Sequence, residues 1–114
     1  YRTLRPPQNF ADVGYVTFDA YYDGDGEASL SMVFTVDDGN GWTDYESGPL
    51  PLLTGWNRLR FNLDGETYRS LADGGGADRA LPPMERTGRA GFFLYRETES
   101  PAVVLFRDIR THER

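Results

Sequence analysis

Apolar and polar residues alternate with a period of two along most of this chain, which is the pattern of strands with one buried face. In GYVTFDAYYDG, Val16, Phe18 and Ala20 are the apolar set. The segment ASLSMVFTV repeats the alternation, with Leu30 and Phe34 on its apolar face. These segments predict two strands, and the DGDGE stretch between them predicts a tight turn that makes them an antiparallel hairpin.

Three later segments also predict strands. NRLRFNL alternates, RAGFFLYRE is apolar or aromatic on both faces, and AVVLFRDIR is rich in β-branched and aromatic residues. Between them, we expect a short helical or irregular turn at 67–71 and a long loop at 72–83, ADGGGADRALPP. Several strands without a long amphipathic helix predict an all-β fold, an antiparallel β-sandwich or jelly roll.

The length of 114 residues favours a single domain, residues 1–114. No stretch approaches the roughly 20 apolar residues of a membrane-spanning helix, so a membrane is not an expected partner. The chain begins at Tyr1 without a methionine, so we expect it to be part of a longer protein.

The net charge is −6, and all 12 basic residues are arginines. An acidic surface repels a phosphate backbone, so nucleic acid is not expected as a partner. The absence of cysteine excludes disulfides, thiol catalysis and thiolate metal sites, and it leaves the redox compartment open.

Three segments, in order, resemble the galactose-binding-like jelly-roll domains that include many carbohydrate-binding modules of polysaccharide-degrading enzymes. They are YVTFDAYYDG, LLTGWNRLRFNLDG and VVLFRDIR. The resemblance spans about Leu4 to Arg110 and implies a jelly roll, an extracellular or cell-surface location, and a polysaccharide or oligosaccharide as ligand. Since a shared fold does not carry a shared function, each of these is an expectation.

The chain departs from that family in two places. The closing strand has Arg107 where such domains often have a first acidic residue, and only Asp108 is kept, so the calcium site implied by the resemblance loses a ligand. A further N-terminal strand is implied as well, and it is either missing or built from residues 2–4.

The two tryptophans receive different interpretations. The family pattern assigns Trp56 to the scaffold, at the start of a strand after a turn glycine. Trp42 follows the DDGNG loop and has Tyr45 three residues on, so we expect both rings at a rim where they stack on a pyranose. The alternative is that Trp42 closes the end of the sandwich.

Two further sets of residues are candidates for ligand contacts. Tyr15 and Tyr21 lie on the polar face of their strand, where they either line a sugar-binding groove or stabilise the sheet as cross-strand pairs. Arg58, Arg60 and Arg96 either bind hydroxyl, sulfate or carboxylate groups of a glycan, or pair with surface acids.

The acidic loops DGDGE and DDGNG carry oxygen ligands suited to Ca²⁺. Asp23, Asp25 and Asp108 are the candidate metal ligands. Neither loop completes an EF-hand, and turn formation accounts for both of them without metal.

Catalysis has little support in the sequence. His112 is the single histidine and lies near the chain end, where we expect it to be frayed. The first hypothesis is therefore a non-catalytic carbohydrate-binding module that tethers a larger extracellular protein to a polysaccharide. The alternative is a structural or adhesive sandwich domain of a surface assembly that contacts neighbouring protein chains.

Overall fold

The fold is that of a computed structural model, which describes residues 2–8, 10–37, 39, 41–64, 67–71, 80–82, 84–97 and 102–114. Nine strands run through these ranges: β1 (Arg2–Gln8), β2 (Val13–Tyr22), β3 (Ala28–Asp37), β4 (Trp42–Ser47), β5 (Leu50–Leu52), β6 (Gly55–Asn62), β7 (Tyr68–Ser70), β8 (Thr87–Arg96) and β9 (Val104–Glu113). No helix within the described ranges is long and apolar enough to cross a membrane.

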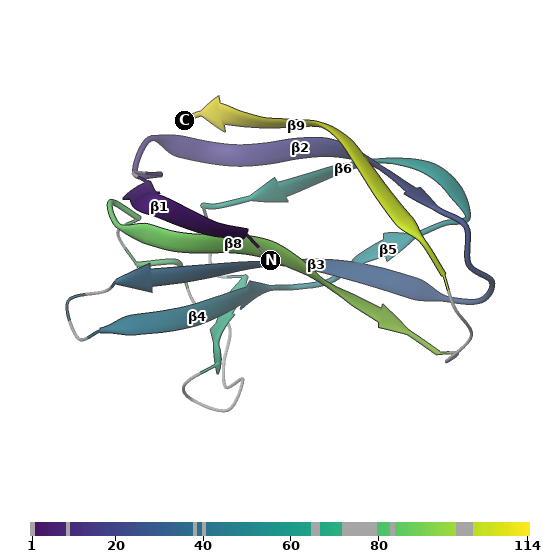
Figure 1. Cartoon of the computed structure of the whole chain (residues 1–114), viewed down its shortest axis with the longest axis horizontal. Helices are drawn as coiled ribbons and strands as arrows, with labels where there is room; N and C mark the ends of the chain where they lie inside the picture. Colours follow the sequence, from purple (N-terminus) through teal and green to yellow (C-terminus); the bar gives the residue numbers. More distant parts are fainter. Residues whose placement is uncertain are drawn as a thin grey trace.

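The strands form two sheets that pack face to face (Figure 1). Sheet A has the order β1-β8-β3-β4-β7, with β5 also paired to β3, and sheet B has the order β6-β2-β9. Every strand pair is antiparallel. The predicted all-β antiparallel sandwich is therefore confirmed, and residues 2–8 do form an N-terminal strand.

The strands on either side of DGDGE do not form the predicted hairpin. β2 lies in sheet B and β3 in sheet A, so the turn carries the chain from one sheet to the other. Gly24 is needed in this crossing, because a Cβ there would lie 2.3 Å from the Tyr22 hydroxyl oxygen. The turn composition predicted a chain reversal correctly, but each strand has one apolar face, and these faces bury each other across the sandwich rather than side by side.

The core lies between the two sheets and is rich in aromatic rings. Phe18 of β2 is fully buried, with its ring centroid 5.9 Å from that of Phe61, 4.8 Å from that of Phe92 and 5.7 Å from that of Phe106. These partners belong to β6, β8 and β9, so one side chain links both sheets.

Residues 67–71 differ from the expected helical turn. Tyr68–Ser70 forms β7 and pairs with β4, and the buried Tyr68 hydroxyl donates a hydrogen bond to the Asn62 carbonyl at 2.8 Å. Of the predicted long loop, residues 80–82 lie outside any strand, and residues 72–79 and 83 are outside the described ranges.

Strand β9 contains a bulge that changes which of its side chains face the core. Residues 107–110 lie opposite residues 17–19 of β2, which is one residue more on β9, and Asp108 has a positive φ of 52°. Aspartate tolerates this left-handed conformation better than most residues. Phe106 before the bulge and Ile109 after it both face the interior as a result.

We expect Phe18→Ala to lower the free energy of unfolding by about 3–5 kcal/mol, because the substitution removes ring contacts to both sheets and leaves a large cavity. Urea denaturation followed by circular dichroism measures this change. Leu53→Ala is the control, since Leu53 is 71% exposed and its truncation should change stability by less than about 0.5 kcal/mol. Equal effects of the two substitutions would contradict the assignment of Phe18 as the link between the sheets.

Candidate functional site

The outward side of sheet B carries a regular array of arginine and aromatic side chains. Alternate residues of β2 are buried, so the residues between them point to solvent, and the flanking strands β6 and β9 place their outward residues beside them. We call this array the outer face. From one end of the sheet to the other, its cross-strand rows are Trp56–Tyr21–Leu105, Arg58–Asp19–Arg107, Arg60–Thr17–Arg110 and Asn62–Tyr15–His112.

Asp19 is the electrostatic centre of the outer face. Its carboxylate accepts hydrogen bonds from Arg58 Nη1 at 3.0 Å and from Arg107 Nε at 3.1 Å, one on each side of β2. The bonds from Arg58 and then Arg107 hold the pKa of Asp19 below its ordinary value. Because each arginine side chain is 56% exposed, the two guanidinium groups remain accessible to a ligand.

Two guanidinium groups of the outer face stack on aromatic rings. The Arg107 guanidinium carbon lies 3.8 Å from the centroid of Trp56, and that of Arg60 lies 3.8 Å from the centroid of Tyr15. Stacking of this kind holds the guanidinium plane by cation–π attraction and leaves its N–H edge available for polar partners. The rings therefore orient the arginines, and those ring faces are occupied before any ligand arrives.

His112 is also part of the outer face and is not frayed. It lies within β9, its ring stacks on Tyr15 with centroids 4.3 Å apart, and its Nε2 is 2.7 Å from Thr17 Oγ1. Since β6 and β9 flank β2 on opposite sides, Arg60 and His112 reach the Tyr15 ring from opposite sides. Tyr15 is thus clamped, and it fixes one end of the array.

Charge is distributed very unevenly between the outer face and the rest of the chain. The outer face carries Arg58, Arg60, Arg107 and Arg110 against the single carboxylate of Asp19, although the whole chain has a net charge of −6. The other acids on these three strands are Asp108, at the bulge, and Glu113, at the end of β9. One carboxylate shared by two arginines leaves an excess of positive charge on this face.

Four of the seven predicted ligand residues meet on the outer face: Tyr15, Tyr21, Arg58 and Arg60. Trp56, interpreted as scaffold from the sequence, is 50% exposed and packs beside Tyr21 with centroids 5.3 Å apart. The period-two pattern already contained this information, because Trp56 has the same parity as Arg58 and Arg60. The outward position of Arg107 could not be predicted in this way, since the bulge interrupts the alternation of inward and outward residues in β9.

Trp42 lies on sheet A, and its ring covers the backbone of Gly88, which has no side chain. A Cβ on Gly88 would come within 2.9 Å of Trp42 Cζ3, so the glycine provides the space in which the indole lies. The Arg86 guanidinium is 5.7 Å from the Trp42 centroid, and Trp42 itself is 49% exposed. The two tryptophans are therefore equally exposed, and they differ in what surrounds them: only Trp56 lies within the outer face.

The other two predicted ligand residues, Tyr45 and Arg96, belong to strands of sheet A. Tyr45 is only 6% exposed and belongs to the core, on the opposite side of β4 from Trp42, so the expected aromatic pair at a rim does not form. Arg96 donates from its Nε to the Tyr22 hydroxyl at 2.8 Å, which ties the end of β8 to the end of β2.

The predicted metal ligands are dispersed. Asp23 Oδ1 accepts a hydrogen bond from the Val103 amide at 2.6 Å, while Asp25 accepts one from the Tyr22 hydroxyl through its main-chain carbonyl at 3.4 Å. Asp108 occupies the β9 bulge. No group of three or more His, Cys, Asp or Glu side chains with metal-binding geometry occurs in the ranges that the structure describes. From the second acidic loop, Asp38 and Asn40 lie outside those ranges.

Sheet A holds a polar cluster around one buried carboxylate, which the sequence did not indicate. Glu46 is 4% exposed, and its Oε2 accepts hydrogen bonds from Ser31 Oγ at 2.6 Å and from the Tyr95 hydroxyl. Burial, and then the hydrogen bond to Glu46, raises the pKa of Tyr95. The two donors come from β3 and β8, so the buried carboxylate of β4 is satisfied by other strands of sheet A.

The fold defines the chain as a two-sheet antiparallel β-sandwich with a cationic, aromatic outer face on its smaller sheet. Comparison with family models, with curated proteins and with solved structures gives no match in any of the three.

The lowered pKa of Asp19 predicts a pH effect on stability. Its contribution is fully present above the ordinary carboxyl pKa of 3.8 and is lost as pH falls through the lower folded-state value. NMR titration of the side-chain carboxyl should give a pKa below 3.8, and Arg58→Gln should raise it, because the largest stabilising hydrogen bond is removed. Arg86→Gln, which is distant in the sequence and pairs with Asp37, should leave the Asp19 pKa unchanged. An Asp19 pKa that stays the same in Arg58→Gln would refute the Asp19–Arg58 ion pair in solution.

Proposed function

We propose that the domain binds an acidic polysaccharide, carboxylated or sulfated, on the outer face of sheet B. The observation that carries this proposal is the stacking of Arg107 on Trp56 and of Arg60 on Tyr15 beside a single shared carboxylate. Ring stacking orients the guanidinium edges in advance, and such edges match the two oxygens of a carboxylate or sulfate.

The spacing of the arginines suits a linear ligand. Arg58 and Arg60 are two residues apart on β6, roughly 6.7 Å along the strand, and Arg107 and Arg110 continue the same rows across β2. An extended chain with repeating anionic groups would meet several guanidinium groups at once. The weak individual contacts of exposed charges would then add up along the chain.

An acidic ligand fits the outer face better than a neutral sugar does. A pyranose stacks on an open ring face, but Tyr15 is flanked by Arg60 and His112, and one face of Trp56 carries Arg107. The excess of positive charge on a chain that is acidic overall also favours an anionic partner at this one place.

A matched pair of probes tests the proposal. Affinity gels containing polygalacturonate should retard the domain, and gels containing its fully methyl-esterified form should not, because esterification keeps the sugar backbone but removes the negative charge of each carboxyl group. Retardation should weaken as salt is raised from 50 to 500 mM, since exposed charges are screened. Equal retardation by both gels would refute an electrostatic mode of binding.

The double substitution Arg58→Gln/Arg107→Gln should reduce affinity for polygalacturonate by about 10-fold or more, because two charge-assisted contacts are lost. Arg86→Gln is the matched control, since Arg86 is similarly exposed and also pairs with an aspartate, but it lies beside Trp42. Loss of binding in Arg86→Gln alone would move the site to the Trp42 surface. Thermal melting of each variant verifies that the sandwich is intact.

A further inference from the structure

The sandwich is open along β9. In the central strand β2, the inward residues Val16 and Phe18 are 3% and 0% exposed, as expected between two sheets. In the neighbouring strand β9, the inward residues Phe106 and Ile109 are 38% and 56% exposed. Side chains that face the core are therefore left in contact with solvent on this side of the molecule.

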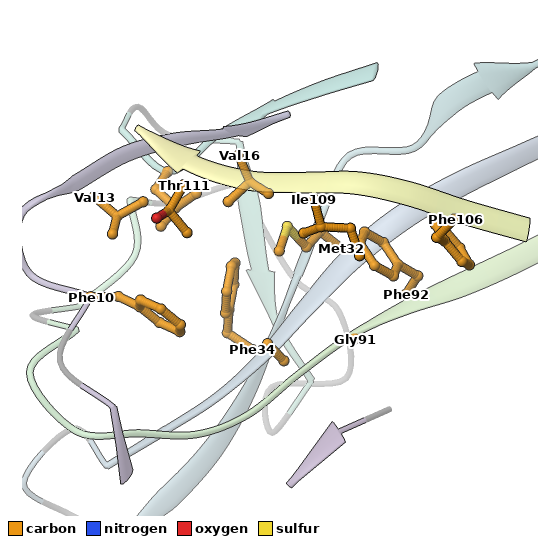
Figure 2. A pocket seen from close by; sticks show the side chains of 12 residues that line it. Phe10, Val13, Val16, Met32, Phe34, Gly91, Phe92, Phe106, Ile109 and Thr111 are labelled. Atoms are coloured by element: carbon orange, nitrogen blue, oxygen red, sulfur yellow. The ribbon is translucent and has the colours of Figure 1, made fainter. Parts of the chain in front are cut away.

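An apolar slot runs under β9, between it and β8 (Figure 2). Its larger part has a volume of about 390 Å³, and Thr111 has the only polar side chain among the described residues that line it. A second cavity of about 250 Å³ continues past Phe92 and Phe106, whose rings stack 4.9 Å apart, as far as Leu94 and Val104. The slot therefore follows β9 for most of its length, and its occupant must be elongated.

The edge of β9 identifies the chemistry of that occupant. Among the described strands, β9 pairs only with β2, so the main-chain N–H and C=O groups along its other side have no strand partner. A lipid chain in the slot would cover these groups without bonding to them, which is unfavourable because buried donors and acceptors would be left unsatisfied. An extended peptide pairs with the same groups, and its alternate side chains enter the slot.

The outward residues of β9 define the other face of such a peptide. Arg107 and Arg110 point outward, so acidic residues would be favoured at the alternate positions of an added strand. A second copy of β9 at the same edge would bring the arginines of the two copies together, which is unfavourable.

We propose that the free edge of β9 accepts one extended peptide strand from a partner molecule, with apolar side chains in the slot and acidic side chains beside Arg107 and Arg110. The added strand would complete the cover of the core and make sheet B four-stranded. This inference goes beyond glycan binding. The two proposed sites share Arg107 and Arg110, but the apolar slot and the free edge of β9, which carry this inference, are not part of the glycan site.

The test uses a labelled eight-residue peptide of alternating isoleucine and glutamate, added to the 114-residue protein. We expect saturable binding by fluorescence anisotropy, together with slower amide hydrogen exchange in β9. Two N-methylated peptides serve as further probes, one methylated on the odd and one on the even residues. Only the peptide methylated on the edge that faces β9 should lose binding, because that edge supplies the hydrogen bonds.

Ile109→Lys places an ammonium group in the slot and should weaken peptide binding at least about 10-fold. Leu53→Lys is the control, since Leu53 is 71% exposed, lies outside β9 and lines neither part of the slot, so this variant should bind the peptide as the wild type does. Circular dichroism of both variants verifies folding, and hydrogen exchange in the wild type tests the proposal without any substitution.

Three results would overturn the proposal. The first is equal peptide affinity in Ile109→Lys and Leu53→Lys. The second is binding of dodecanoate, a non-peptide apolar probe, with no binding of any peptide. The third is concentration-dependent dimerisation that protects β9 amides and that the peptide does not compete with, which would make a second copy of the chain the occupant. Loss of polygalacturonate binding alone would leave this inference standing.

Discussion

The strict alternation of β2 is the constraint on which the rest of the molecule depends. This strand is central in sheet B, and its two faces have opposite tasks. Its inward residues build the core around Phe18, and its outward residues place Asp19 between arginines from both neighbouring strands. A shift of register by one residue would exchange the two faces, exposing Phe18 and burying Asp19, so the core and the cationic face enforce the same register.

Two arginines share Asp19 because β6 and β9 flank it at the same row. Exposed ion pairs of this kind contribute little to stability, since water screens them and long side chains lose freedom in forming them. These ion pairs matter because they hold the arginine side chains in position. Aromatic rings and one carboxylate hold the guanidinium groups of the outer face in defined positions, and this arrangement is what an extended anionic ligand requires for more than nonspecific attraction.

The sequence predicted the parts of the fold that depend on local pattern, and it failed where the answer depends on pairing. Alternation located β2, β3 and β6, because one buried face produces a period of two wherever the strand lies. The same pattern does not say which strands are neighbours, so the two strands around DGDGE were paired although they lie in opposite sheets. Tyr45 was misplaced for a related reason: burial depends on which side of a strand faces the second sheet, and a loop motif beside Trp42 carries no such information. Trp56 differs, because the family pattern assigned it to the scaffold although the alternation of its own strand already placed it beside Arg58 and Arg60.

The bulge at Asp108 shows how one residue joins the two surfaces discussed above. In a regular strand, Arg107 and Ile109 would share one face, which would place either a charge in the core or an isoleucine among the arginines. The extra residue at the bulge reverses the parity after it, so that Arg107 and His112 both face outward while Phe106, Ile109 and Thr111 face inward. Asp108 takes up the left-handed backbone that this reversal needs. The cationic face and the apolar slot are therefore not separate accidents of composition, because the same irregularity in β9 sorts its charged residues to one side and its apolar residues to the other.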